Sequence, residues 1–451
     1  MKKSACFVLC SLCFFYSAMT GQAADLHGQI GSVKTEDITD SEEGDLKTGN
    51  GIPTQCVEEI LAGLTLQEKV AQLFVVTPEA LTGVDSVTMA GETTAAAFSS
   101  YPVGGIIYME PNIQTWEQTS EMLSAMQDIS DARIGLPVFL CVDEEGGNVR
   151  RVSGRIENTP YIPEMLSVGN TKDPLQAYKS GTTIGAYLRQ LGFNVDFAPV
   201  ADVLTNPDNT VIGSRSFGSD PNLAASMVSF DVKGLQEEGI CATLKHFPGH
   251  GNTSEDSHQG AAVSYKTLEE LKSCELIPFE SGIAAGADLV MAGHIAFPNI
   301  TGDHTPASLS HFFLTNLLRE QMGFDGVIIT DALSMGAVTN LYGSGEAAVQ
   351  AFLAGSDLLL MPADFQSAYA AVLNEVGAGR ISEERLEESL RRIISLKLRQ
   401  QEQSAGIQSE EAAVDVFGGQ QVQDGEDIQQ VPYSDGSVTV EEGFDGVIIE
   451  E

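Results

Sequence analysis

Three histidines, one lysine and two carboxylates fall within a single run of the chain, from Lys245 to His258. One proline and two glycines interrupt regular structure within this run. The residues just before it, 241–244, are apolar and predict a buried strand. A strand therefore delivers a loop of ionisable side chains, an arrangement in which binding and catalytic residues concentrate.

The first two histidines of this run, His246 and His250, are four residues apart, the spacing of two metal ligands on one helical turn. Pro248 and Gly249 lie between them and prevent a helix from aligning the pair. A metal hydrolase stays an alternative, but no metal or other cofactor is predicted. Histidine in a loop is also suited to acid–base chemistry, because its unperturbed pKa lies near the working pH.

Ionisable side chains also follow four other apolar runs directly. Asp143 and Arg151 come after residues 137–142, Asp202 and Arg215 after 195–201, His294 after 289–292, and Asp331 after 326–330. In a barrel of parallel strands the active site lies at the carboxyl ends of the strands. Ionisable residues after a single strand would be ordinary surface charges. Ionisable residues after several strands of one barrel predict a shared site.

The elements that must position these side chains alternate along the chain. Apolar runs of strand length lie at 72–76, 104–109, 137–142, 195–201, 241–245, 289–292, 326–330 and 358–361. Amphipathic helical patterns separate most of them, for example at 116–132, 176–191, 223–238, 268–285, 309–321 and 346–353. Continuously apolar strands are typical of a parallel sheet covered on both faces. Eight repeats favour an α/β protein with a closed (β/α)8 barrel, and the absence of a glycine-rich phosphate loop argues against a dinucleotide-binding fold.

The beginning of the chain has the pattern of a targeting segment. Two lysines precede an apolar stretch, and small residues follow at 21–23, which predicts a signal peptide over residues 1–24. We therefore expect a secreted or cell-envelope protein. Leucines rather than small residues precede Cys10 and Cys13, which disfavours a lipid anchor. No later stretch is long and apolar enough to cross a bilayer.

Composition separates the barrel from its flanks. Residues 25–54 are polar and acidic and are interpreted as a flexible linker, and residues 401–451 as a disordered acidic tail, which leaves residues 55–400 as a single catalytic domain. The net charge of −39 argues against nucleic acid as a partner. The four cysteines beyond the signal peptide match neither a zinc pattern nor a disulfide framework, so no structural disulfide is expected.

Several segments together resemble one family of carbohydrate-active enzymes. They are Lys-His-Phe-Pro-Gly-His-Gly at 245–251, Asp-Ser-His at 256–258, Asp-x-Glu-Gly-Gly at 143–147, Val-Ile-Gly-x-Arg-Ser-Phe-Gly at 211–218 and Thr-Asp-Ala at 330–332. In this order they are similar to the β-N-acetylglucosaminidases of glycoside hydrolase family 3, over roughly residues 57–400. The resemblance implies a (β/α)8 barrel of the type found in the single-domain members.

The resemblance also implies catalytic roles. Asp331 matches the family's nucleophile, and a carboxylate at a strand end is well placed to attack an anomeric carbon. His258 matches the acid/base, and Asp256 matches the partner that orients it, with the logic of the aspartate in a serine-protease triad. For an isolated loop histidine a surface position would be the ordinary interpretation, and for Asp331 a helix N-cap. The surrounding motifs favour catalysis in both cases.

The same resemblance assigns Lys245, His246, Asp143, Arg151 and Arg215 to the set that binds the sugar hydroxyls. A structural ion pair is the competing interpretation for Lys245 and for Arg215. The chain departs from the family pattern at three positions, with Glu144 in place of glutamine, Asn148 in place of arginine and Asn252 in place of aspartate. Glu144 is expected to add negative charge beside the sugar site. These three positions bear on the substrate preference.

The sequence therefore predicts a retaining, exo-acting β-N-acetylglucosaminidase that acts on cell-wall fragments or chitooligosaccharides. Its predicted partner is a glycan containing N-acetylglucosamine. A family 3 β-glucosidase or xylosidase and an N-acetylglucosamine phosphorylase are the nearer alternatives. Asp256 and His258 disfavour the first of these, because such relatives take their acid/base from an added domain. A non-catalytic glycan-binding protein would be expected to have lost Asp331 or His258.

Overall fold

The computed structural model describes residues 52–253 and 262–418. The predicted signal peptide, residues 25–51 of the predicted linker and the acidic end from residue 419 lie outside the described residues. So do Asp256 and His258.

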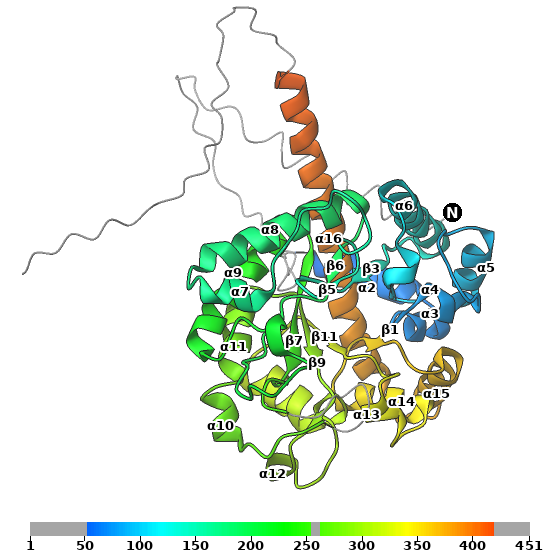
Figure 1. The fold of residues 1–451 in the computed structure, drawn as a ribbon. Coiled ribbons are helices and arrows are strands. Elements are labelled where there is room, and N and C mark those ends of the chain that lie inside the picture. Colours follow the sequence, from blue (N-terminus) through cyan, green and yellow to red (C-terminus); the bar gives the residue numbers. More distant parts are fainter. Residues whose placement is uncertain (1–51, 254–261, 419–451) are drawn as a thin grey trace, which may run out of the picture. The chain divides into compact units, whose positions relative to one another are not determined.

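Eight parallel strands form one sheet that closes on itself (Figure 1). They are β1 (Phe74–Val76), β2 (Gly105–Ile107), β3 (Phe139–Val142), β6 (Val195–Asp196), β7 (Cys241–Phe247), β9 (Leu289–Ala292), β11 (Val327–Thr330) and β12 (Leu359–Leu360). The order is β11-β9-β7-β6-β3-β2-β1-β12, and a bridge between Ile329 and Leu358 joins the two ends. Every residue of these strands is buried, which explains their continuous apolar runs. The predicted (β/α)8 barrel is confirmed.

Helices surround the strands, and most follow the predicted patterns. They include α6 (Trp116–Ile134), α8 (Pro174–Leu191), α9 (Pro221–Glu237), α14 (Ser344–Ala354), α15 (Phe365–Gly377) and the π-helix η4 (Phe312–Gln321). Others are α2 (Thr54–Gly63), α3 (Leu66–Ala71), α4 (Pro78–Thr82), α5 (Glu92–Ser100), α7 (Met165–Asn170), α12 (Pro298–Thr301) and α13 (Gly336–Thr339). The helix predicted over 268–285 is two helices, α10 (Leu268–Lys272) and α11 (Leu276–Ala284). A capping box between Thr267 and Glu270 begins the first of them.

The part of the last helix, α16 (Glu383–Gly418), that precedes residue 401 contacts the amino ends of the strands. Lys397 Nζ donates to Gln72 Oε1 at 2.8 Å just before β1, and Gln400 Nε2 lies 2.8 Å from Cys241 Sγ at the start of β7. Burial lowers the pKa of Lys397 to about 7. The helix continues to Gly418, whereas a disordered tail was predicted from residue 401, because the glutamine, glutamate and alanine of this stretch are good helix formers.

Two expectations about the chain as a whole can be set beside the structure. Cys141, Cys241 and Cys274 are free thiols, and the two of them that begin or lie within strands are buried. Within the described ranges, no helix has the length and hydrophobicity that a membrane span requires.

Helices α8 and α9 pack closely because glycines line their contact. A Cβ at Gly234 of α9 would lie 2.4 Å from the Tyr178 carbonyl oxygen of α8, and one at Gly181 would lie 2.6 Å from Asp231 Oδ1. Asp231 is only 4% exposed, and its Oδ1 has no hydrogen-bond partner within the described part of the chain. Burial raises the pKa of Asp231 to about 8.

Replacing Asp231 with asparagine should therefore stabilise the fold at alkaline pH. Unfolded aspartate ionises near pH 3.8, whereas the folded Asp231 keeps its proton to about pH 8. Between these values wild-type stability falls by about 1.4 kcal/mol per pH unit on account of this residue. We expect Tm of Asp231→Asn to exceed the wild-type value at pH 8 and to converge with it near pH 4. A constant difference across this range, or one matched by the exposed Asp128→Asn, would contradict this account.

Candidate functional site at the carboxyl ends of the strands

Asp331 directly follows β11 and is held by the backbone around it. Its N–H donates to the Ala292 carbonyl at the end of β9 (2.9 Å), and its Oδ1 accepts the Ala332 N–H at 2.7 Å. Burial by itself would raise the pKa of Asp331, but His294, His246, the Ala332 N–H and Lys245 together hold it below its usual value. The side chain is partly exposed. Asp331 is thus an oriented, ionised carboxylate at the mouth of the barrel.

His294, which comes shortly after β9, fixes the residue that follows Asp331. Its Nε2 lies 3.0 Å from the Ala332 carbonyl oxygen, so this nitrogen carries the proton and donates. Its Nδ1 lies 2.6 Å from the Ser308 hydroxyl oxygen. The ring is 1% exposed. His294 therefore acts as a positioning residue for the turn that carries Asp331.

A second group of charges is centred on Glu145, which sequence reasoning did not select. Arg215 donates to it in a bidentate pair, with Nε to Oε2 and Nη2 to Oε1 both at 2.8 Å. Lys245 Nζ lies 2.6 Å from Glu145 Oε1 and 2.9 Å from Asp143 Oδ1. The side chains of Lys245 and Glu145 are each 2% exposed. Lys245 and Arg215 were both predicted as site residues, and a buried cation such as Lys245 requires a carboxylate partner. The Asp143-Glu144-Glu145 run was the sequence signal that could have identified Glu145.

The pKa shifts in this network show that neighbouring opposite charges outweigh the effect of burial. Burial opposes the charge on Glu145, but Arg215 and Lys245 together hold its pKa well below the usual range. Burial likewise opposes the charge on Lys245, and Asp143 and Glu145 raise its pKa above the usual value. Glu145, Lys245 and Arg215 are therefore charged at neutral pH. Structural ion pairing and a sugar-binding role are compatible here, since Asp143 remains 18% exposed.

Asp202, at the exit of β6, holds the histidines of the 245–251 loop. Its Oδ2 lies 2.8 Å from His246 Nδ1, and its Oδ1 accepts the His250 N–H at 2.6 Å. Burial opposes its charge, but His246 and His250 keep its pKa below the usual value. An ionised Asp202 requires the proton on His246 Nδ1, which leaves Nε2 as the other polar atom of that ring. His250 is committed to loop structure, with its Nδ1 2.8 Å from Thr253 Oγ1.

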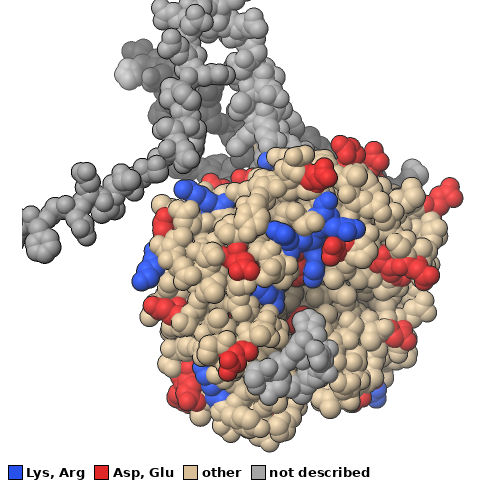
Figure 2. Space-filling view, viewed as in Figure 1, with Lys and Arg blue, Asp and Glu red and all other residues tan. Residues whose placement is uncertain are grey.

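Arg151 reaches the same region from the hairpin of β4 (Glu144–Gly146) and β5 (Val149–Arg150). Its N–H donates to the Asp143 carbonyl at 3.3 Å. Its Nε is buried and has no hydrogen-bond partner among residues 52–253 and 262–418. A buried donor of this kind is suited to an acceptor on a bound ligand. Figure 2 shows Lys and Arg side chains gathered beside a hollow, with acidic side chains between them.

Glu144 does not add charge to the sugar site as expected. It is fully buried, and its carboxylate accepts from Val152 N (2.7 Å), Ser153 N (2.9 Å), Ser153 Oγ (2.5 Å) and Tyr187 Oη (2.7 Å). Its role is to fasten the following loop to β4. Of the other two departures, Asn148 donates to Glu164 at 2.8 Å, and Asn252 accepts from Ser264 Oγ at 3.1 Å.

The metal alternative finds no support in these contacts. Across the ranges that the structure describes, no group of three or more His, Cys, Asp or Glu side chains is placed to hold a metal ion. The Nδ1 atoms of His246 and His250 are bonded to Asp202 and Thr253. The catalytic pair predicted at Asp256 and His258 lies outside the described residues.

The described groups suit an uncharged ligand that is rich in hydroxyls. Cationic groups on Lys245, Arg151 and Arg215 lie among the carboxyl groups of Asp143, Glu145 and Asp331. Such a set offers donors and acceptors at fixed angles. One carboxylate, Asp331, is held apart from the Lys245–Glu145–Arg215 network by a different strand and by its own backbone contacts.

Comparisons with known proteins agree with this geometry. The model of the glycosyl hydrolase family 3 N-terminal domain matches residues 65–396. Beta-hexosaminidase A of Pseudoalteromonas piscicida is 33% identical over 333 residues, which cover 68% of this chain and 55% of that protein. Beta-hexosaminidase LpqI of Mycobacterium tuberculosis is 37% identical over 317 residues, covering 68% of this chain and 76% of that protein.

The chain is also similar to a solved structure from the same family. It is a glycoside hydrolase family 3 beta-N-acetylglucosaminidase from a Paenibacillus species, with a TM-score of 0.71 and 38% identity. The match covers 75% of this chain and 63% of that one. The chain thus spans little more than half of the Pseudoalteromonas protein and under two thirds of the Paenibacillus one.

Proposed function

We propose, because the chain belongs to glycosyl hydrolase family 3, that it removes terminal β-linked N-acetylglucosamine from glycans with retention of configuration. The observation that carries this proposal is Asp331, a carboxylate held ionised at the exit of β11. The names of its relatives, beta-hexosaminidases and a beta-N-acetylglucosaminidase, support the choice of sugar.

The proposed reaction has two steps. In the first, Asp331 Oδ attacks the anomeric carbon, the bond from that carbon to the leaving oxygen breaks, and His258 gives its proton to that oxygen. In the second, His258 takes a proton from water, the water oxygen attacks the same carbon, and Asp331 leaves as a carboxylate. Asp256 orients His258 and stabilises its cationic form. No cofactor takes part.

The sugar is held by the charged residues at the ends of the other strands of the barrel. Asp143 and Lys245 supply an acceptor and a donor, and Arg151 supplies the buried Nε donor. His246 adds Nε2, with Asp202 fixing its tautomer. Arg215 acts mainly by keeping Glu145, and through it Lys245, in place. Cell-wall fragments and chitooligosaccharides are the proposed natural substrates, consistent with the signal peptide that the sequence predicts.

The activity is tested with aryl glycosides and with product analysis. We expect release of the chromophore from an aryl β-N-acetylglucosaminide, and much slower release from the matching β-glucoside and β-xyloside. Proton NMR should show the β-anomer of N-acetylglucosamine as the first product, as retention requires. The α-anomer as first product would overturn the retaining mechanism. Sugar 1-phosphate as the main product in phosphate buffer would favour phosphorolysis instead.

The acid role of His258 makes its own prediction. His258→Ala should lower kcat/KM for chitobiose by about 10²–10⁴-fold, the usual contribution of general acid–base catalysis. An aryl substrate with a good leaving group should lose far less, because its leaving oxygen needs little protonation. The measurement is kcat/KM for both substrates in wild type and variant. Equal losses on the two substrates would count against His258 as the acid.

A further inference from the structure

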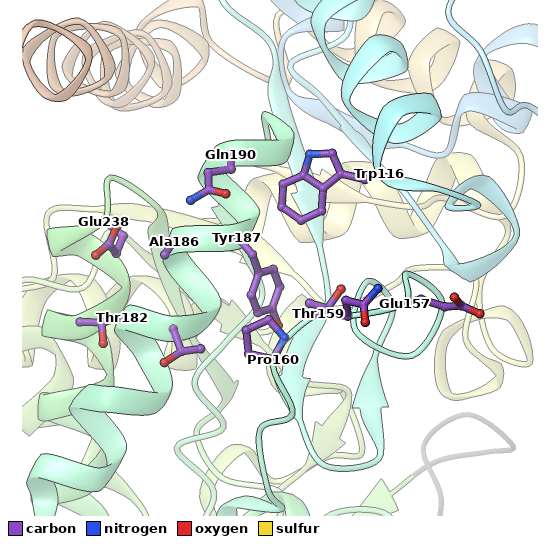
Figure 3. Close-up of a pocket in the computed structure, with 11 residues that line it drawn as sticks. Trp116, Glu157, Thr159, Pro160, Thr182, Ala186, Tyr187, Gln190 and Glu238 are labelled. Carbon is purple, nitrogen blue, oxygen red and sulfur yellow. The ribbon is translucent and has the colours of Figure 1, made fainter. Parts of the chain in front are cut away.

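A second pocket lies on the flank of the barrel, outside the set of residues assigned to catalysis. It has a volume of about 650 Å³ and is formed by the start of α6, by α8 and by the loop at 157–160 (Figure 3). This volume lies within the range of small-ligand sites, roughly 300–1,000 Å³. None of its lining residues belongs to the predicted sugar-binding or catalytic set.

The walls of this flank pocket combine aromatic and polar groups. Trp116, the first residue of α6, and Tyr187 of α8 both project toward the space between them in Figure 3. Gln190, Thr182 and the loop residues contribute uncharged polar groups around these rings. An aromatic face beside hydroxyl and amide groups matches the two sides of a pyranose ring, which has apolar C–H faces and a polar edge.

Charge narrows the class of ligand. Glu157 and Glu238 line the flank pocket, and none of the described residues that line it is basic. Glu238 is paired with Arg189 at 3.7 Å, so it is Glu157 in particular that disfavours an anionic ligand such as a phosphate or a carboxylated sugar. A neutral sugar would instead use the carboxylates as hydrogen-bond acceptors for its hydroxyls.

The flank pocket is also attached to the catalytic face. The Tyr187 hydroxyl donates to Glu144 Oε1 at 2.7 Å, and Glu144 is followed directly by Glu145 of the charged network. The same carboxylate holds Val152 and Ser153, at the start of the loop that runs on to the pocket wall. A glycan bound in the flank pocket would thus rest on the element that carries the sugar-binding carboxylates.

We propose that the flank pocket is a second glycan-binding site for neutral N-acetylhexosamine oligosaccharides, with Trp116 as its stacking platform. The choice of this sugar rests on the proposed function. The site would hold glycan at the enzyme while Asp331 acts on a chain end.

Trp116 gives a direct test, because it is the only tryptophan of the chain and its fluorescence reports this pocket alone. The Asp331→Ala variant should be titrated with tri-N-acetylchitotriose so that no substrate is consumed. We expect a saturable change in fluorescence with a Kd on the order of millimolar, as for a small site with few contacts. Gln190 is an exposed residue of α8 that lines the pocket, and Gln190→Ala combined with Asp331→Ala should weaken binding several-fold. Lys179→Ala, exposed on the same helix but outside the pocket, should not.

A further variant separates this pocket from the catalytic site. Adding Arg151→Ala to Asp331→Ala weakens the catalytic sugar site and should leave the fluorescence titration unchanged. Loss of the signal with Arg151→Ala, no signal at all, or a response to spermidine but not to the neutral sugar would each overturn the proposal. Hydrolysis is not part of this readout, so an active enzyme without the signal refutes the second site alone. A signal in the Asp331→Ala variant, together with no hydrolytic activity in the wild-type protein, refutes the proposed function instead.

Discussion

Replacing Asp331 with alanine should lower kcat/KM for an aryl β-N-acetylglucosaminide by on the order of 10⁴-fold or more. Asp331 is the carboxylate proposed to form the bond to the anomeric carbon, and neighbouring charges and the Ala332 N–H hold it ionised. Removing it eliminates the covalent intermediate and leaves only the binding contribution of the other residues. The measurement is steady-state kinetics, with circular dichroism to show that the variant is folded.

Azide distinguishes a lost nucleophile from a damaged site. The Asp331→Ala variant leaves space beside the anomeric carbon, where azide can attack directly as the aryl oxide departs. We expect partial recovery of chromophore release and an α-glycosyl azide as product, since a single displacement inverts the carbon. Asp208→Ala, at an exposed position in another loop, serves as the control and should behave as wild type. A β-glycosyl azide from the Asp331→Ala variant would mean that another residue is the nucleophile.

Removing Glu145 should have the second large effect, on stability as well as binding. Glu145→Ala leaves the buried cation of Lys245 and the partly buried cation of Arg215 without their shared carboxylate. Breaking a buried ion pair in this way costs about 3–5 kcal/mol of unfolding free energy. Glu145→Gln keeps the size and one oxygen acceptor and should fall between wild type and Glu145→Ala. Denaturant unfolding at pH 7 measures both changes, and KM should rise in the same order.

Two controls test the Glu145 prediction: unfolding measured at acidic pH, and a variant of an exposed ion pair. Lys245 and Arg215 lower the pKa of Glu145, so the stability it contributes is present above the pKa of the unfolded side chain and is lost as pH falls through the folded one. The gap between wild type and Glu145→Gln should therefore narrow in acid. Glu375, paired with the largely exposed Arg380, gives a matched variant, Glu375→Ala, that should change stability little. Equal effects of Glu145→Ala and Glu375→Ala would refute the importance of the buried network.

The strands were predictable because burial on both faces leaves a strong local signal. All eight expected runs contain strands of the barrel, although the observed strands, such as β6 at Val195–Asp196, are often shorter than the apolar run. Helix boundaries were less predictable where a local capping motif starts a new helix inside a longer amphipathic pattern. The capping box at Thr267 and Glu270 begins a separate short helix inside the predicted 268–285 segment. Likewise α16 passes residue 400, since helix-forming side chains continue into a stretch whose charge suggested disorder.

The sequence by itself determined which strand ends carry charged groups, and hence that Asp143, Arg215, Lys245 and Asp331 would lie at one mouth of a barrel. Only the tertiary structure decided how those charges pair. Glu144 and Glu145 are adjacent carboxylates in β4, and nothing local distinguishes them. Because successive side chains of a strand point to opposite faces, Glu144 turns toward Ser153 and Tyr187, while Glu145 turns toward Lys245 and Arg215. Those partners lie far away in the chain, and barrel closure is what brings them within hydrogen-bond distance.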